Sequence, residues 1–480
     1  MEVQPMTTPE SRTYVRRGVW RASVLTLLAL IVFVAITVGF DIVYQPRLIG
    51  LELVLASLLL ALVPAGLWLV LFYLQDRFEP EPKAEVARIF TIGLALAGAI
   101  GLPVVQQVFH LTEWQYRDLA STILGNIFIA GAMEAFIIYA TVRYFIYHSP
   151  QFNERSDGVL YGTAAGLGYA TALNIQFILS SGGAALGAGA VHTTGVALAH
   201  AAFGGVLGYF LGRAKLEREP VWWLPAGLLF TTVLIGLFTV LRSQAQTGRL
   251  LPGTAAHLPS FTGMLLAAVL ALLIASAITW LMRRDTALAL SGRRTAPPPD
   301  APIGDRAANW AVIGLFILCL IVGGLVWDRT EHRMTAFDVD GFRGSYPAHF
   351  SLATRPNEIL RAVDVLETQA QFVISVIPDV QPAMLRSVIS QLAVMRAEEY
   401  ESYRVLDTQE RQWHGRPILE HHFAGVEPPT LELGLPHLIE GVDYIIADGN
   451  RAVVITMLAS PETYAAVEPL FTRFLGTISF

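Results

Sequence analysis

Glu134, Asn174 and His200 are the residues whose types best suit acid–base or metal chemistry in an apolar setting, because each lies deep within a long apolar stretch. A charged side chain at the middle of a bilayer costs about 2.5–3.5 kcal/mol on insertion scales. An acid, an amide and an imidazole on three neighbouring stretches therefore predict a shared interior site. A buried hydrogen-bond cluster that holds helices together is the alternative, and the residue types alone favour neither.

Two kinds of hydrolytic chemistry are open to these residues. A catalytic metal takes about three protein ligands and keeps one position for water. Glu134 and His200 supply two ligands, and the amide of Asn174 is a poor zinc ligand. His192 precedes His200 by about 12 Å along a helix axis, so one ion is not easily held by both. Without a metal, Glu134 would act as general base and His200 as acid or oxyanion partner.

The apolar stretches at 122–147, 158–179 and 190–212 carry these residues, and each is long enough to cross a bilayer as a helix. The chain has 480 residues, of which 54% are hydrophobic and 15% charged, with a mean hydropathy of +0.51. Soluble domains carry about 25% charged residues. We therefore expect an all-α polytopic membrane bundle of about nine helices, which span residues 22–40, 51–74, 89–109, 122–147, 158–179, 190–212, 222–241, 261–282 and 309–327.

Charge and cysteine content exclude several classes of protein. The net charge is −6 and no basic stripe contains interleaved aromatic residues, so the lipid bilayer is an expected partner and nucleic acid is not. Cys319 is the one cysteine of the sequence, which excludes a disulfide or a thiolate metal site within the chain.

Lysine and arginine are distributed unevenly between the two sets of connections. The set that begins with the N-terminal segment is rich in them, whereas the other set holds Arg47, Arg117, Arg242 and Arg249. Connections rich in Lys and Arg stay in the cytoplasm. The sequence thus predicts a multi-pass protein of the plasma membrane, with a cytoplasmic N-terminus and a C-terminal domain outside the cytoplasm.

Changes in composition divide the chain into parts. We expect a cytoplasmic segment over 1–21, eight membrane spans over 22–282, a proline-rich cytoplasmic linker over 283–308 and a ninth span over 309–327. Residues 335–480 are typical of an extracytoplasmic α+β domain.

The C-terminal domain has local signals for strands and helices. Alternating residues predict strands over 369–377, 404–408 and 417–423, and a hairpin over 442–458. Helical spacing over 384–395 predicts one helix, and Ser460, with Pro461 behind it, predicts the start of a last helix. His414, His421 and His422 invite a metal interpretation, but the last two are adjacent on a strand and face opposite sides.

Several short motifs occur in a fixed order between residues 70 and 215. The loop 76–82 reads Asp-Arg-Phe-Glu-Pro-Glu-Pro, and 157–162 reads Asp-Gly-Val-Leu-Tyr-Gly. Segment 166–170 reads Gly-Leu-Gly-Tyr-Ala, and 200–203 reads His-Ala-Ala-Phe. In this order and spacing, the region resembles the PrsW family of intramembrane proteases. The C-terminal domain resembles, more loosely, the PsbP/Mog1-like fold, with segment 346–351 as an opening strand.

The sequence departs from the family pattern at polar positions. Where the family has Glu-Glu followed by Lys, this chain has either Met133-Glu134 or Glu134-Ala135, and no Lys follows. Where the family has Glu-Asn, this chain has Leu173 before Asn174. The catalytic set expected from the family is therefore reduced to Glu134, Asn174 and His200.

The resemblance implies an intramembrane peptidase that cleaves a membrane-anchored protein. Glu134 would be base or ligand, His200 ligand or acid, and Asn174 would orient them. A divalent metal such as zinc, bound by Glu134 and His200, is the cofactor that the resemblance implies. The alternative is a non-catalytic receptor or scaffold that retains the pocket and binds a partner, and a transporter is a weaker third class.

Overall fold

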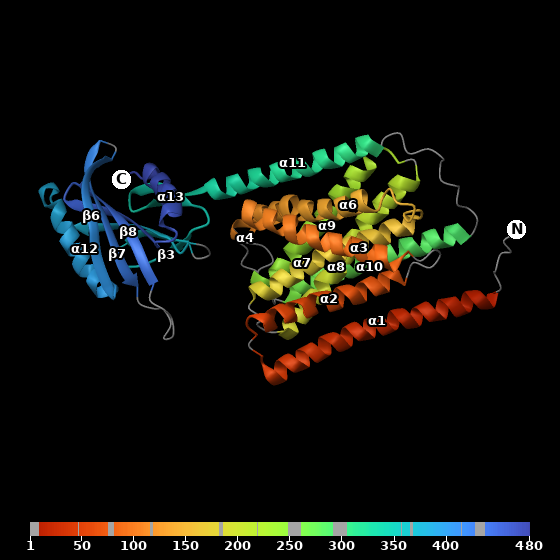
Figure 1. Cartoon of the computed structure of the whole chain (residues 1–480). Helices are drawn as coiled ribbons and strands as arrows, with labels where there is room; N and C mark the ends of the chain where they lie inside the picture. The colour runs from red at the N-terminus through yellow and green to blue at the C-terminus, as the bar shows by residue number, and fades with distance from the viewer. Residues whose placement is uncertain are drawn as a thin grey trace. The chain divides into compact units, whose positions relative to one another are not determined.

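The computed structural model forms two compact units, Met1–Asp328 and Arg329–Phe480, each described here by itself (Figure 1). The structure describes residues 9–46, 48–74, 81–115, 119–181, 186–217, 219–247, 261–290, 305–356, 358–364, 368–413, 415–427 and 437–480. The motif residues 76–80, most of the proline-rich linker and His414 lie outside these ranges.

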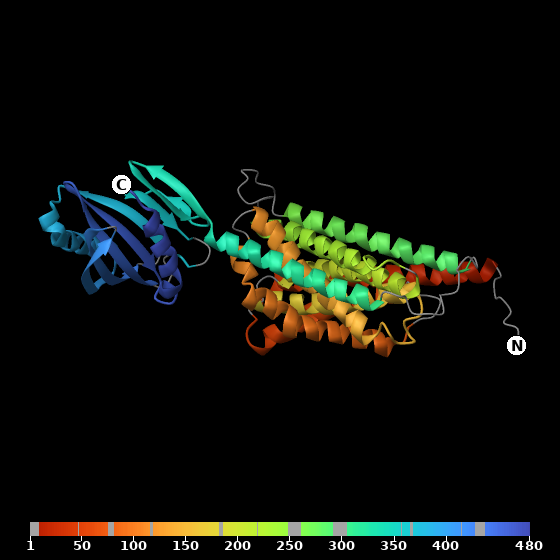
Figure 2. The same cartoon turned by 90° about the horizontal axis from the view of Figure 1, so that it is seen from above.

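The first unit consists of helices that run along one common direction (Figure 2). In chain order they are α1 (Pro9–Tyr44), α2 (Leu51–Tyr73), α3 (Lys83–Leu96), α4 (Leu111–Trp114), α5 (Leu119–Gly125), α6 (Ala132–Phe145), α7 (Arg155–Ser180), α8 (Leu186–Leu216), α9 (Trp223–Thr247), α10 (Phe261–Leu290) and α11 (Asp305–His332). Wider π-helical turns, η1 (Ala97–Gly101) and η2 (Val104–Val108), extend α3, and η3 (Asn126–Gly131) joins α5 to α6.

Seven of the described helical segments are long and apolar enough to cross a membrane: Val24–Tyr44, Leu51–Tyr73, Lys83–Val108, Leu119–Phe145, Leu186–Leu216, Trp223–Arg242 and Asp305–His332. The stretches expected at 158–179 and 261–282 are helical too, within α7 and α10. α7 is not among the seven, and within the described part of α10 the piece Leu266–Ile278 is a shorter apolar helix. α7 is buried along most of its length, so its small and polar residues face other helices.

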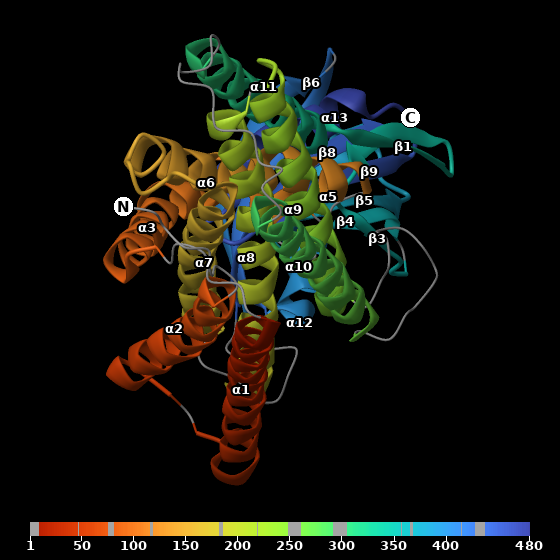
Figure 3. The ribbon, with the colours of Figure 1, turned by 90° about the vertical axis from the view of Figure 1, so that its right-hand side faces the viewer.

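α7 and α8 form the centre of the unit, with α1, α2, α3, α9 and α10 around them (Figure 3). In the most apolar window of α8, 83% of the residues are buried, against 11% in α1, so α8 is surrounded by protein and α1 is peripheral. An antiparallel pair of helices at the centre of a bundle must approach closely, and the glycines of α7 and α8 permit this.

The contact between α7 and α8 is made by glycines that face each other. A Cβ atom on Gly162 would collide with the carbonyl oxygen of Gly204, and one on Gly204 would collide with that of Gly162. Gly158 and Gly208 form the same reciprocal contact one turn away. Neither helix can therefore carry a side chain here without moving the other.

The second unit contains a seven-stranded antiparallel sheet and a separate hairpin. The hairpin pairs β1 (Met334–Val339) with β2 (Phe342–Pro347). The sheet has the order β3-β4-β5-β9-β8-β7-β6. Its strands are β3 (Ser351–Ala353), β4 (Glu358–Val363), β5 (Gln371–Pro378), β6 (Ser402–Trp413), β7 (Arg416–Glu427), β8 (His437–Asp448) and β9 (Arg451–Ala459).

Two helices pack on opposite faces of this sheet. α12 (Leu385–Glu399) covers the face that carries Ile445 and Val454, and α13 (Tyr464–Thr477) covers the face that carries Val453 and Ile455. Neighbouring residues on β9 thus enter different cores, as the alternation of side chains on a strand requires.

The start of α13 differs from the sequence prediction. The helix begins at Tyr464, and not directly after Ser460. Residues 461–463 form a turn in which the carbonyl oxygen of Ser460 accepts hydrogen bonds from the backbone N–H groups of Thr463 and Tyr464. The predicted short strand at 404–408 is part of the longer β6.

A buried ion pair lies between α12 and the sheet. The guanidinium of Arg396 donates two hydrogen bonds of 2.6 Å to the carboxylate of Asp443, which is fully buried. Thr456 donates a third to the same carboxylate at 2.7 Å. His421 lies nearby, and burial lowers the pKa of its ring.

Replacing Gly204 with valine should destabilise the first unit by about 1–3 kcal/mol, the usual cost of overpacking. The added side chain would meet the backbone of Gly162 and Gly166. The midpoint of thermal unfolding in detergent measures the effect. Gly195→Val is the matched control, because Gly195 lies on the same helix with open space at its Cβ position. Equal shifts in the two variants would contradict the close contact.

Replacing Arg396 with methionine should destabilise the second unit by about 3–5 kcal/mol, because the buried carboxylate of Asp443 loses its partner. The double variant Arg396→Met/Asp443→Leu should recover much of this loss. Hydrogen exchange of the β8 and β9 amides in the full chain provides the measurement. The exposed pair of Arg386 and Glu410 supplies the control, since Arg386→Met should cost under about 1 kcal/mol.

Candidate functional site

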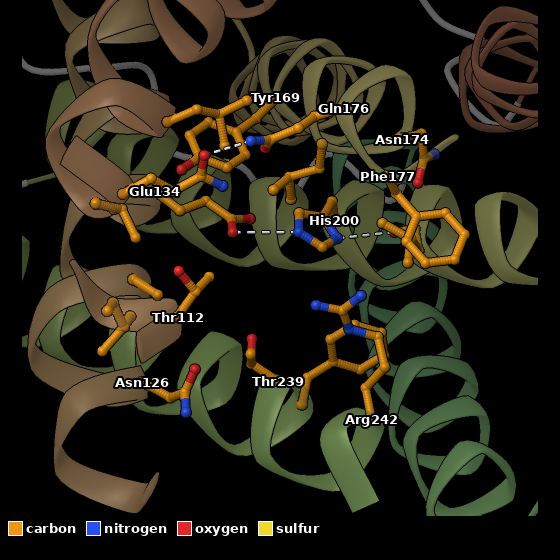
Figure 4. Close-up of a pocket in the computed structure, with 18 of the residues that line it drawn as sticks. Thr112, Asn126, Glu134, Tyr169, Asn174, Gln176, Phe177, His200, Thr239 and Arg242 are labelled. Atoms are coloured by element: carbon orange, nitrogen blue, oxygen red, sulfur yellow. Dashed lines mark hydrogen bonds and ion pairs between the residues drawn. The ribbon is translucent and has the colours of Figure 1, made fainter. Parts of the chain in front are cut away.

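A cavity of about 420 Å³ lies within the first unit. Its wall combines the C-terminal parts of α7 and α9 with the N-terminal half of α8, the η3–α6 junction and the short α4. Glu134, Asn174 and His200 all line it, together with His192 and Arg242 (Figure 4). The structure therefore places the three predicted site residues on one cavity.

Glu134 and His200 form a direct contact. The Oε2 atom of Glu134, on α6, lies 3.2 Å from Nε2 of His200, on α8. Both side chains are buried, with 4% and 5% of their surface exposed. The other carboxylate oxygen of Glu134, Oε1, is buried without a hydrogen-bond partner among the described residues. One carboxylate oxygen is thus engaged by the ring, and the other is a buried acceptor without a partner among the described residues.

The orientation of the His200 ring is set from its own helix. Nδ1 lies 2.8 Å from the carbonyl oxygen of Val196, one turn earlier on α8. A carbonyl oxygen can only accept, so Nδ1 carries a proton and donates it. In a neutral ring Nε2 is then an acceptor that faces a carboxylate oxygen. Two facing acceptors need a shared cation, which is either a proton or a metal ion.

Aromatic rings surround this pair. Tyr169 stacks beside the His200 ring at a centroid distance of 6.3 Å, and Phe203 and Phe238 meet it edge-on at 5.7 and 5.9 Å. These rings hold the imidazole in place and keep its surroundings low in polarity, where electrostatic interactions are stronger than in water.

The helix that carries Glu134 is irregular just before it. η3 is a π-helical stretch that ends at Gly131, and Asn126 at its start donates from Nδ2 to the carbonyl oxygen of Thr122 at 2.7 Å. π-Helical turns shift the register of the residues that follow and are frequent at functional sites. A Cβ atom on Gly131 would meet the backbone of α9 at Thr232.

Asn174 lines the cavity but contacts the backbone of α8. Its Nδ2 atom donates to the carbonyl oxygen of Thr193 at 3.1 Å, and Oδ1 is buried with no hydrogen-bond partner among the residues that the structure describes. The amide thus links α7 to α8 one turn before Val196. Asn174 thus contacts the backbone of the helix that carries His200, and its hydrogen bond goes to Thr193 and not to the His200 ring.

His192 and Arg242 form a second polar pair in the cavity. Nη1 of Arg242 lies 3.2 Å from Nε2 of His192, and the imidazole stacks on Phe177 at a centroid distance of 3.8 Å. The sequence indicates a connection between spans for Arg242, whereas the structure places it within α9. One signal in the sequence could have placed His192 on the cavity. His192, Val196 and His200 are spaced four residues apart, which puts all three on one face of a helix.

The motif residues Asp157 and Tyr161 lie away from the cavity, in the first turns of α7, whereas Tyr169 of the 166–170 motif lines it. The carboxylate of Asp157 accepts hydrogen bonds from the backbone N–H groups of Asn153 and Glu154, which caps the helix. Tyr161 donates to the buried carboxylate of Glu81 at 2.5 Å. These motifs fix the helix ends.

Glu134 and His200 fit two of the three protein ligands that a catalytic zinc ion takes. The tethering of Nδ1 to a backbone carbonyl oxygen is also the arrangement that orients a metal-binding histidine. Among the described residues, no group of three His, Cys, Asp or Glu side chains lies close enough to hold one ion. His192 hydrogen bonds to Arg242 and is not part of such a group.

Comparison with known proteins identifies the membrane unit. Residues 81–274 match the family described as PrsW family intramembrane metalloprotease. A protease PrsW of Halalkalibacterium halodurans is 31% identical over 37% of this chain and 79% of its own length, and that of Geobacillus kaustophilus is 31% identical over 38% and 78%. The protease PrsW of Bacillus subtilis is 28% identical over 35% of this chain and 73% of its own length.

Solved structures show a weak likeness. Cyanobacterial PsbP from Synechocystis is 10% identical, with a TM-score of 0.24, and the match covers 30% of this chain and 91% of that one. The Ran-binding protein Mog1p of Saccharomyces cerevisiae is 10% identical, with a TM-score of 0.23 over 31% of this chain and 95% of that one.

The match spans every cavity residue discussed above, from Glu134 to Arg242, and the family resemblance in the sequence motifs is confirmed. With 31% identity over most of a protease PrsW, this chain belongs to the PrsW family of intramembrane proteases.

Proposed function

We propose that the protein hydrolyses a peptide bond of a membrane-anchored protein, and that Glu134 and His200 are its catalytic pair. The observation that carries this proposal is the buried 3.2 Å contact between the two side chains on the wall of a cavity. A buried acid next to a histidine costs stability and is found where proton transfer is needed.

In the proposed reaction, Glu134 accepts a proton from a water molecule as that water attacks the carbonyl carbon of the scissile bond. The C–O bond forms, and the carbonyl oxygen becomes an oxyanion. When the C–N bond breaks, the leaving nitrogen takes a proton from the pair through Nε2 of His200. The products are a carboxylic acid and an amine, so the protons balance. The bond from Nδ1 to Val196 keeps the ring oriented throughout.

A divalent metal such as zinc is compatible with this pair. Glu134 and His200 would hold it, and it would supply a Lewis acid for the carbonyl oxygen. In that case the tethering of Nδ1 directs the lone pair of Nε2 toward the ion.

Asn174 is a positioning residue in this proposal. Its bond to the carbonyl oxygen of Thr193 fixes α7 against the turn of α8 that precedes Val196, and Val196 in turn orients His200. Loss of the amide would therefore act on the pair through α8.

The membrane arrangement that we propose has nine spans, with α7 and α10 added to the seven apolar segments. The charges of the connections support a cytoplasmic N-terminus in the plasma membrane and a second unit outside it. The parts would be a segment 1–21, a bundle 22–282, a linker 283–308, a span 309–327 and an outer domain 335–480. The outer domain would then capture a substrate or sense a signal.

Replacing Glu134 with glutamine should reduce cleavage at least about 100-fold, because general acid–base catalysis contributes about 10²–10⁴-fold. His200→Ala should have a similar effect. Membrane-protein fragments are compared in cells that express each variant at matched levels. Glu52→Gln, an exposed substitution on α2, is the control. If folded, inserted Glu134→Gln and His200→Ala proteins give the fragments of the wild type, the pair is not catalytic and the binding-scaffold alternative gains support.

Purified protein should contain about one divalent metal ion per chain if the ion is held by this pair, and His200→Ala should lower its affinity at least about tenfold. Metal content is measured by elemental analysis, and activity is followed during chelation and metal return. Activity that survives chelation in metal-free protein would show instead that the pair shares a proton and needs no ion.

A further inference from the structure

Arg242 introduces a positive charge into the cavity of the proposed peptidase. Among the described residues that line the cavity, Glu134 is the acidic one and Arg242 the basic one, histidines aside. Figure 4 shows the Arg242 guanidinium directed into the same open space that Glu134 and His200 face. The cavity therefore has an acidic position for chemistry and a separate basic one.

The position of the guanidinium is fixed by neighbouring rings. It donates to Nε2 of His192, and this imidazole is held against Phe177 by stacking. Arg242 makes further interactions within the chain. A guanidinium has five N–H donors in a planar fork, so these contacts and a carboxylate ligand are compatible.

We propose that Arg242 and His192 form a subsite for a carboxylate of the substrate, which rests on the proposed function of this cavity. The carboxylate belongs to an aspartate or glutamate side chain, or to a chain terminus. His192 lies about 12 Å from His200 along α8. An extended peptide advances about 3.3 Å per residue, so the carboxylate lies within roughly four residues of the scissile bond.

The direction of the half-buried Arg242 side chain supports a ligand role over a surface role. A long basic side chain near a helix end usually extends to the membrane surface. Arg242 instead turns to the cavity and bonds an imidazole that is itself part of the wall. Arginine binds carboxylates with two parallel hydrogen bonds, which gives affinity and fixes the direction of the bound chain.

Binding can be measured without cleavage. Full-length Glu134→Gln protein in phosphatidylcholine nanodiscs is titrated with fluorescent single-span peptides that carry one glutamate at successive flank positions, or glutamine or lysine there. One peptide set ends in a free carboxylate and the other in an amide. The same titrations are made with Arg242→Gln, with Arg242→Glu and with Arg306→Gln, an exposed control on α11.

A glutamate within roughly four residues of the scissile bond should tighten peptide binding about tenfold or more over a glutamine there, as a charge-assisted hydrogen bond does. Arg242→Gln should abolish this ratio, and Arg306→Gln should preserve it. In Arg242→Glu, a lysine peptide should replace glutamate as the preferred ligand, which shows that the variant is folded. If only the peptides with a free terminal carboxylate bind more tightly than their amide counterparts, the subsite binds a chain terminus.

Three results would overturn the subsite. The first is a glutamate preference that folded Arg242→Gln retains, and the second is the absence of a preference in every protein. The third is an effect of Arg242 that appears only when anionic lipid is added to the nanodisc and does not depend on the peptide. Since binding is read on Glu134→Gln, failure of cleavage by the wild type would reject the proposed function and leave this result unaffected.

Discussion

The close approach of α7 to α8 is the constraint on which the rest of the membrane unit depends. Glycines on both helices bring the two backbones into contact, and the last of these contacts reaches the site itself. A Cβ atom on Gly166 would collide with the carbonyl oxygen of His200. The residue that faces Glu134 is therefore held from behind by backbone contact. The packing of α8 therefore determines the geometry of the site, because a shift of α8 would move His200 and His192 together.

The site also shows why buried polar groups are kept in an apolar bundle. Burying Glu134 and His200 costs free energy for each side chain. This cost is reduced only if a proton or a metal ion lies between the two facing acceptor atoms. The aromatic rings around His200 lower the polarity of its surroundings and so strengthen that interaction. Such a pair adds little to stability compared with apolar packing, which is consistent with the catalytic role that we propose for it.

Sequence patterns predicted the elements better than the site. Apolar length located the helices, and alternation located β5, β7, β8 and β9 and part of β6, because both signals follow from local periodicity. β1, β3 and β4 were not predicted. The placement of Glu134 against His200 could be anticipated from depth in the membrane. The contact of Arg242 with the cavity could not be anticipated, since a position just beyond an apolar stretch is typical of a connection between spans. The π-helical turns of η3 and the contact of Asn174 with Thr193 depend on packing between helices distant in sequence.

The lining of the cavity bears on how a membrane-embedded peptide bond can be attacked at all. A helical substrate hides its carbonyl carbons within its own hydrogen bonds, so it must unwind, and unwound backbone is tolerated in a membrane only where polar groups replace those bonds. The Oδ1 atoms of Asn126 and Asn174 are buried acceptors with no partner among the described residues. Both line the cavity. In the proposed reaction, these oxygens would accept N–H groups of an unwound segment, while Glu134 and His200 would act on its carbonyl group.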